Sequence, residues 1–185
     1  MAGNFLCHFL YLYMSILKLS RLFVLGTEYW GRKASGILFY CAEDGTVLLL
    51  KRASRTIGGE KWGIPGGSLE IYDDYHSRNV SRNKNFFESE REKDPDPEES
   101  LFLESALREV QEEMDFSPKI NIIKVDDFRD GQFTYKTFIS LVSLDEKEMF
   151  KDVKLNWEHT DKKWFKTNDI PSNVIGSLKQ IISSL

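Results

Sequence analysis

Cysteine is scarce in this sequence, and the scarcity excludes several kinds of site. The chain of 185 residues contains two cysteines, Cys7 and Cys41, which lie far apart. Their spacing matches no metal-binding or redox motif. Two isolated cysteines are typical of a reducing compartment, in which both thiols stay free. We therefore expect a cytoplasmic protein without disulfide bonds.

An excess of positive charge is also missing. Lysine and arginine number 25 against 29 aspartates and glutamates, and the net charge is -4. Such a balance gives no general attraction to nucleic acid. A polyanionic substrate would need a bound cation or a local basic patch.

The sequence has no uninterrupted apolar run of membrane-spanning length. Phe5–Leu17 is strongly apolar but short for a span, and Lys18 and Arg21 follow it, whereas a signal peptide has its charges first. We therefore expect residues 1–33 to pack on the domain, and we expect no membrane partner. A membrane anchor and a translation start at Met14 stay open as alternatives.

The length suits one well-packed domain and is short for two. We place this domain at residues 34–185. Within it, residues 71–99 are dense in charged and polar side chains with few apolar anchors. We predict that about 71–97 form a solvated, partly disordered insertion.

Apolar patterning predicts the elements of the domain. Two β-rich runs, 35–40 and 46–51, flank Asp44-Gly45, a hairpin signal. Further predictions are a loop at 55–61, a turn-rich stretch at 62–67, a helix from about 98 to 114, strands at 120–125 and 134–142 with a turn at 130–131, a short strand at 162–166 and a helix at 172–185. This order predicts an α/β fold in which helices cover a mixed sheet.

The helix carries three glutamates within five residues, Glu109, Glu112 and Glu113. At about 100° per residue they lie within about a third of a turn of one another. An apolar stripe runs beside them, formed by Leu103, Ala106, Leu107, Val110 and Met114. Crowded carboxylates repel, and a hard cation such as Mg²⁺ or Mn²⁺ removes that cost. A solvated acidic face is the alternative.

Two separated motifs resemble the Nudix hydrolase family, whose box reads G-x5-E-x7-R-E-U-x-E-E-x-G-U, with U a bulky aliphatic residue. Residues 108–113 match its R-E-U-x-E-E core throughout. Gly67 is similar to its first glycine and follows a W-x-x-P-G motif at 62–66. The hairpin at 36–52 is similar to the family's entry hairpin. The resemblance implies an α/β/α sandwich with a mixed β-sheet between helices.

The sequence departs from the family box in three places. The family glycine lies 14 positions before the arginine, whereas Gly67 lies 41 positions before Arg108, so 27 residues are inserted. The first box glutamate falls at Ser100; the alternatives are Glu98, Glu99, Glu104 and, as a weaker option, Glu70. Asp115 replaces the glycine after the glutamate pair, and aspartate tolerates left-handed backbone better than most residues.

The resemblance implies metal-dependent hydrolysis of a nucleoside diphosphate linked to another group. The implied ligands of Mg²⁺ or Mn²⁺ are Glu109, Glu112, Glu113 and the carbonyl of Gly67. Arg108 is expected to orient the glutamates. The general base is Glu112, Glu113 or an acid outside the box, for which Glu158 is a candidate; a plain loop contact by Glu158-His159 is the alternative.

Substrate contacts are predicted on both sides of the box glycine. Arg52 is a candidate for binding phosphate, with a surface ion pair as the alternative, and Gly66 and Gly67 are expected to line the substrate. Trp62 and Phe133 are candidates for stacking on a base, although core packing is the simpler interpretation of both.

Two other functions stay open. The first is hydrolysis of an mRNA cap, because Arg78, Arg82 and Lys84 in the insertion lie near Phe86 and Phe87. The second is a non-catalytic nucleotide-binding protein of the same fold. We expect a small-molecule nucleotide as partner, and nucleic acid only if capped RNA is the substrate. The sequence leaves the base, the leaving group and the oligomeric state open.

Overall fold

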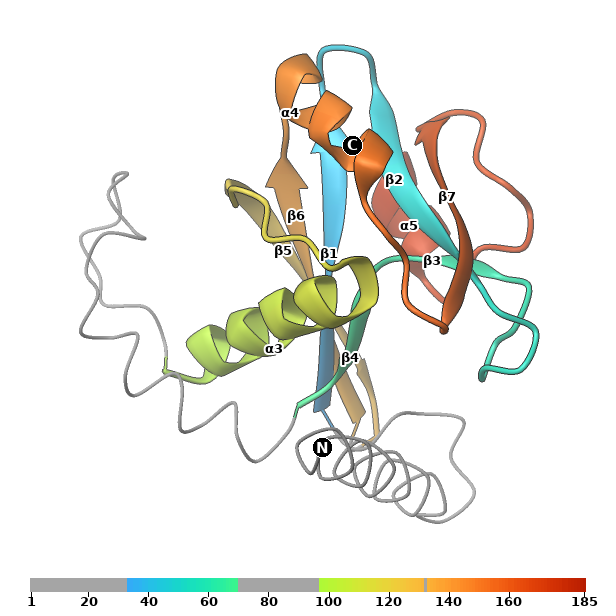
Figure 1. Ribbon diagram of the computed structural model, residues 1–185. Helices are drawn as coiled ribbons and strands as arrows, with labels where there is room; N and C mark the ends of the chain where they lie inside the picture. The colour runs from blue at the N-terminus through green and yellow to red at the C-terminus, as the bar shows by residue number, and fades with distance from the viewer. Residues whose placement is uncertain (1–32, 70–96, 132) are drawn as a thin grey trace, which may run out of the picture.

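A computed structural model describes residues 33–69, 97–131 and 133–185 of the chain (Figure 1). The predictions for the N-terminal segment, for Met14 as a start and for the insertion concern residues outside these ranges, apart from the terminal positions 33 and 97, and they stay predictions. Within the described ranges, no helix combines the length and the apolarity that crossing a membrane would require.

In the described ranges, seven strands form one sheet, and three helices and a 3₁₀ turn accompany it. In chain order the elements are β1 (Lys33–Cys41), β2 (Thr46–Arg52), β3 (Trp62–Gly63), β4 (Gly66–Ser68), α3 (Pro97–Met114), β5 (Ile122–Asp130), β6 (Phe133–Leu141), α4 (Leu144–Met149), η2 (Phe150–Asp152), β7 (His159–Lys166) and α5 (Leu178–Ser183).

The sheet is mixed, as predicted. Its main path runs β3-β2-β1-β6-β5, while β4 pairs with β1 and β7 pairs with β2. Strands β1 and β6 are parallel, with Ile37 opposite Phe138, and the other pairs are antiparallel. Parallel neighbours need a long crossover connection, and the chain between β4 and β5, which contains α3, supplies it.

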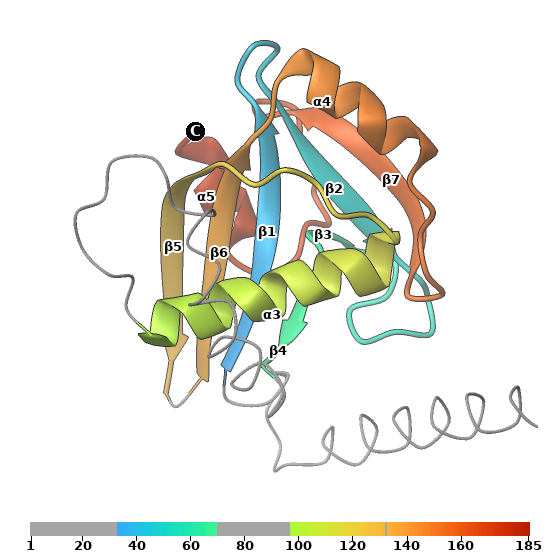
Figure 2. The same ribbon diagram turned by 60° about the vertical axis from the view of Figure 1, so that its left-hand side comes forward.

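Helices cover both faces of the sheet (Figure 2). Alternate residues of β1 and β2 point to opposite sides. One side packs against α3 in a cluster that includes Ile37, Phe39, Leu48, Leu50, Phe102, Ala106, Val110 and Met114. The other side packs against α5 in a cluster that includes Leu38, Val47, Leu49, Ile139, Leu178, Ile181 and Ile182. The predicted α/β/α sandwich is confirmed.

The apolar stripe of α3 is centred slightly differently from the prediction. Phe102, Ala106, Val110 and Met114 are buried in the core. The predicted stripe members Leu103 and Leu107 pack only partly against it. The rotation follows from Phe102, whose large ring takes the central place on this face.

The C-terminal helix is shorter than predicted. It covers Leu178–Ser183, because residues before it bond to β3 instead. Trp62 donates its backbone N–H to the carbonyl of Asn173 (3.0 Å) and accepts from the N–H of Ile175 (2.8 Å). Gly176 then adopts a positive φ of 56°, which glycine tolerates and which separates this segment from the helix.

The stretch at 62–67 forms two short strands, where only turns were predicted. Strand β4 lies antiparallel to β1, with Gly66 opposite Gly36. A Cβ atom on Gly66 would lie 2.5 Å from the carbonyl oxygen of Ser35. The close backbone approach therefore requires glycine at this position.

The helix α4 was not predicted. Ser143 is its N-cap, and a reciprocal capping box joins the Ser143 and Glu146 side chains to each other's backbone. The strand β5 also starts later and continues further than predicted, over Ile122–Asp130. Its turn at Asp130-Gly131 is as predicted, with a positive φ of 57° at Gly131.

Described residues on the two sides of the gap at 70–96 both contact Lys33, at the start of β1. Leu69 donates its backbone N–H to the carbonyl of Lys33 (3.0 Å). The Lys33 ammonium forms an ion pair with Glu98 (2.6 Å) in the first turn of α3. The two sides of the gap in the described chain are thus both close to Lys33.

Candidate active site

The two halves of the box meet in space. The backbone N–H of Gly66 donates to Glu113 Oε2 (3.2 Å). A Cβ atom on Gly67 would lie 2.3 Å from Glu109 Oε1, so the Glu109 carboxylate lies against the bare Cα of Gly67. The glycines of β4 are therefore in contact with acids of α3 that lie more than 40 positions later.

The three box glutamates do not share one environment. Glu109 and Glu113 are four residues apart, face the sheet and are buried, with 7% and 2% of their surface exposed. The Glu112 side chain is 44% exposed. Helical spacing explains the difference, because Glu112 is rotated by about 100° from Glu113. Asp115 follows with a φ of 45°, in the left-handed region expected there.

Arg108 bridges the buried and exposed acids. Its Nη1 donates to Glu109 Oε1 (2.9 Å) and to Glu112 Oε1 (3.2 Å). Its Nη2 donates to the carbonyl of Ser68 (3.1 Å) and to Ser105 Oγ (3.4 Å). The planar guanidinium thus fixes both carboxylates relative to β4, and this position fits the predicted orienting role.

Glu158 lies on the other side of Glu113. It belongs to the turn before β7, and its Oε2 is 4.0 Å from Nη2 of the buried Arg52. The pKa of Glu113 is raised well above 4.5 by burial first and then by the charges of Glu109 and Glu158, while Arg52 opposes the rise. Glu113 therefore interacts electrostatically with two other carboxylates and one guanidinium.

The oxygen atoms around Glu113 are of the kind that bind a hard divalent cation. Buried carboxylates that repel one another are stabilised in their charged form by a nearby cation. Oxygen ligands from Glu109, Glu113 and the carbonyl of Gly67 are of the kind that Mg²⁺ and Mn²⁺ bind. Among residues 33–69, 97–131 and 133–185, however, no three Asp, Glu, His or Cys side chains are close enough together to form a ready-made metal cluster.

Tyr135 closes the site from the side of β6, and the sequence analysis missed it. A Cβ on Gly36 would lie 2.4 Å from its hydroxyl oxygen, and one on Gly66 would lie 2.7 Å away. Burial, followed by the charges of Glu113 and Glu109, raises the pKa of the phenol. The hydroxyl is therefore neutral at pH 7 beside the acids. The alternation of inward residues along β6 is the signal that could have found it.

His159 is a neutral, buried side chain. It opens β7 opposite Arg52. Burial, and then the charge of Arg52, lowers its pKa to about 4. Its Nδ1 has no hydrogen-bond partner in the described part of the chain. At neutral pH it adds no charge to the site.

The predicted stacking residues have different surroundings. Trp62 packs edge-on against Phe165, with ring centroids 4.8 Å apart, which supports core packing. Phe133 lies 6.4 Å from the ring of Tyr135. Trp157, which directly precedes Glu158 in the chain, is an exposed aromatic residue, with 63% of its surface exposed. Its place directly before the candidate acid was the available signal in the sequence.

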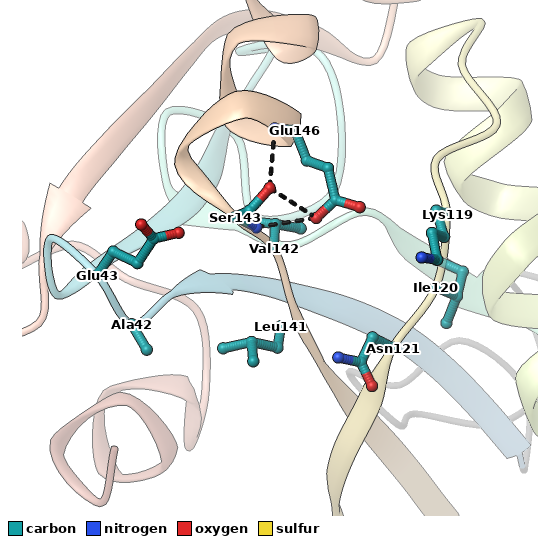
Figure 3. A pocket seen from close by; sticks show the side chains of 9 residues that line it. All are labelled: Ala42, Glu43, Lys119, Ile120, Asn121, Leu141, Val142, Ser143 and Glu146. Carbon is teal, nitrogen blue, oxygen red and sulfur yellow. Dashed lines mark hydrogen bonds between the residues drawn. The ribbon is translucent and has the colours of Figure 1, made fainter. Parts of the chain in front are cut away.

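A hollow of about 520 Å³ lies elsewhere, between the β1–β2 hairpin, the segment before β5 and the start of α4 (Figure 3). Its polar lining includes Glu43, Lys119, Asn121 and Glu146. The Glu146 carboxylate accepts from the N–H of Ser143 in the capping box of α4 (2.8 Å), and Glu43 accepts from the N–H of Leu144 (2.9 Å). This hollow contains none of the predicted site residues.

Comparison with known proteins gives structural matches only. No family model matches the sequence, and no curated protein matches it. The solved structures that match include a MutT protein from Methanosarcina mazei, which is 17% identical with a TM-score of 0.52 over 82% of this chain and 90% of that chain.

Two further matches are named by their activity. An Ap4A hydrolase from C. elegans is 17% identical, with a TM-score of 0.50 over 82% of this chain and 92% of that chain. A dihydroneopterin triphosphate pyrophosphohydrolase from E. coli is 16% identical, with a TM-score of 0.50 over 84% of this chain and 95% of that chain. At this identity the likeness shows the fold: the chain has the fold of the Nudix hydrolases, and the predicted resemblance is confirmed at that level.

Proposed function

We propose that this protein is a metal-dependent hydrolase that cleaves the diphosphate linkage of a small nucleoside diphosphate derivative. The observation that carries the proposal is the contact of Glu109 and Glu113 with Gly67 and Gly66 across the inserted residues. Core packing explains a buried apolar stripe, but it does not explain two carboxylates buried close together against glycines, because burying like charges is costly.

Each box residue has a proposed task. Glu109, Glu112, Glu113 and the carbonyl of Gly67 would hold Mg²⁺ or Mn²⁺, with Glu112 turning inward from its exposed position. When bound, the cation supplies charge neutralisation of the diphosphate and a more acidic water. Arg108 keeps the Glu109 and Glu112 carboxylates in place through its fork of donors.

Glu158 is the proposed general base, in preference to Glu112 and Glu113. Glu158 is close enough to raise the pKa of Glu113. It lies in the turn before β7 and not on α3, so it is not one of the proposed metal ligands. A base must lie within hydrogen-bond reach of the attacking water, and Glu158 borders the place where the acids converge.

Substrate binding is proposed to use the residues around this point. Arg52 is a buried cation 4.0 Å from Glu158, suited to a phosphate oxygen. The backbone of Gly66 and Gly67 would line the diphosphate. Trp157 offers an exposed face on which a base can stack. The names of the two matched enzymes, an Ap4A hydrolase and a dihydroneopterin triphosphate pyrophosphohydrolase, support a substrate with linked phosphates and a planar ring system.

A nucleotide panel tests the proposal. Purified protein would be assayed with Mg²⁺ or Mn²⁺ against nucleoside triphosphates, nucleotide sugars and dinucleoside polyphosphates, with release of phosphate, pyrophosphate or a nucleoside monophosphate as the readout. We expect turnover of at least one class, and its loss in Glu112→Gln without loss of folding. The matched control is Glu148→Gln on α4, an exposed glutamate that pairs with Lys151. No product from any panel member would refute the proposal.

The mRNA-cap alternative and the cytoplasmic location stay predictions. The basic and aromatic residues behind the cap alternative lie outside the described residues. Deleting residues 71–97 and measuring binding to capped RNA would separate a cap hydrolase from a small-nucleotide hydrolase. Tight nucleotide binding without metal-dependent turnover would instead favour a non-catalytic protein.

A further inference from the structure

A four-residue turn before β7 carries Glu158, and Asn156 starts it. The backbone N–H of His159 donates to the carbonyl of Asn156 (3.3 Å). The backbone N–H of Glu158 donates to the side-chain oxygen Oδ1 of Asn156 (2.9 Å). A side-chain oxygen that accepts from the N–H two residues later is an Asx turn, which asparagine and aspartate form readily.

Backbone hydrogen bonds join the same turn to α3 and to the end of β2, the elements that carry Glu113 and Arg52. The backbone N–H of Asn156 donates to the carbonyl of Glu113 (2.9 Å) in the last turn of α3. That carbonyl has no partner within the helix, as is general for the last four. The backbone N–H of Ala53, directly after β2, donates to the carbonyl of Glu158 (2.8 Å). The turn therefore bridges the end of α3 and the end of β2.

The charged groups that face the Glu158 carboxylate come from those two elements. Arg52 lies 4.0 Å away at the end of β2, and Glu113 on α3 interacts with it by charge repulsion. Because one neighbour attracts the carboxylate and the other repels it, its direction depends on how the turn is held. Asn156 is the side chain of the turn that bonds to Glu158's own backbone.

We propose that Asn156 is a positioning residue that acts through Glu158, holding its carboxylate beside Glu113 for its task as the base. This role rests on the proposed function. Replacing Asn156 by alanine keeps the backbone hydrogen bond to the carbonyl of Glu113 but removes the Oδ1 acceptor of the Glu158 N–H. Substitution therefore loosens the direction of Glu158 without detaching the turn from α3.

Four variants test this role by steady-state kinetics with the panel nucleotide of highest turnover. They are Asn156→Ala, Asn156→Asp, Glu158→Gln and the double variant Asn156→Ala/Glu158→Gln. We expect Asn156→Ala to lower kcat on the order of tenfold, as small misplacements of a reacting group do, with KM changed less than about twofold. Asn156→Asp keeps the acceptor oxygen and should recover most of the rate.

The double variant separates positioning from general support. If Asn156 acts through Glu158, adding Asn156→Ala to Glu158→Gln costs nothing further, because the group it positions is already gone. Equal losses in both backgrounds, or no recovery with aspartate, would overturn the proposal. Asn168→Ala, an exposed asparagine in the turn after β7, is the matched control and should behave as the wild type.

An amide-exchange measurement completes the test without relying on activity. The Glu158 amide should exchange faster in Asn156→Ala than in the wild type, while the Asn156 amide keeps its protection. Unchanged exchange at Glu158 would overturn the proposal. If Glu158→Gln is fully active while Glu112→Gln is inactive, the positioning role of Asn156 is refuted and the hydrolase proposal stands. If the wild type is inactive on every nucleotide of the panel, both proposals are refuted.

Discussion

Two acidic regions of this protein, at different ends of β1, have opposite surroundings. At the hairpin end, Asp44 accepts hydrogen bonds from the Lys147 ammonium and from Thr46 Oγ1 (2.7 Å). Partial burial alone would raise its pKa, but these partners lower it to about 2. At the Gly66 end, Glu113 is buried beside Glu109, and its pKa is raised. The first acid is paired with a cationic side chain, whereas the second is buried beside like charges and is a proposed ligand of the cation.

The largest effect on activity is expected from neutralising Glu113. Glu113→Gln should lower kcat by at least about a hundredfold, as loss of a group that stabilises transition-state charge does. Because burial holds the folded pKa of Glu113 well above its ordinary value, its charge costs folding free energy at higher pH. The metal-free variant should therefore be at least as stable as the wild type at pH 7 in urea titrations. Full activity of Glu113→Gln would break the comparison.

Gly67→Ala should disturb the same region through packing. The new Cβ would lie 2.3 Å from Glu109 Oε1, so the carboxylate must move, at a cost of about 1–3 kcal/mol typical of overpacking. We expect lower activity and a lower midpoint in urea unfolding. In a Glu109→Ala background the space is free, and Gly67→Ala should then cost little stability. The same cost in both backgrounds would contradict the contact.

Trp157→Ala tests whether this exposed ring, next to Glu158 in the chain, stacks on the base of the substrate. Stacking on one base contributes about 1–3 kcal/mol, so KM for a nucleotide should rise about tenfold. Thermal stability should hardly change, since the ring is 63% exposed. Phe128→Ala, another exposed aromatic residue, serves as control. An equal rise of KM for a base-free substrate such as inorganic triphosphate would show that Trp157 does not contact the base.

The smallest effect, on stability alone, is expected from neutralising Asp44. Asp44→Asn should lower stability by about 1 kcal/mol or less, the usual range for a partly exposed ion pair. The folded pKa of about 2 lies below the ordinary value of 3.8, so the contribution is present above about pH 4 and is lost as pH falls toward 2. Urea titrations at pH 2, 4 and 7 should show this loss in the wild type and not in Asp44→Asn. A more stable variant at pH 7 would contradict the assignment.

The sequence predicted the helix and its acids because both rest on local signals. The apolar spacing of α3 and the acidic residues at its start are contained within its own residues. The hairpin was equally accessible, since Asp44-Gly45 marks the turn. The helix α4 was not predicted, although Ser143 and Glu146 have the spacing of a capping box, which is visible in the sequence.

The rest of the site depends on pairings between distant residues. Glu158 lies beside Arg52 because β7 pairs with β2, and a register shift at Lys51/Arg52 sets His159 opposite Arg52. Tyr135 reaches the glycines because β6 runs parallel to β1. Hydrophobic patterns of single strands do not specify which strand is the neighbour, so these contacts could not be predicted from the sequence.

The contacts of Leu69 and Glu98 with Lys33 have a consequence for the length of the chain between β4 and α3. Leu69 bonds to the Lys33 carbonyl, and Glu98 pairs with the Lys33 ammonium. Lengthening a connection whose ends are already held together adds entropy cost only as the logarithm of its length. Going from 14 to 41 positions costs about 1 kcal/mol by loop closure. The contact between β4 and α3 is therefore compatible with connections of varied length between them.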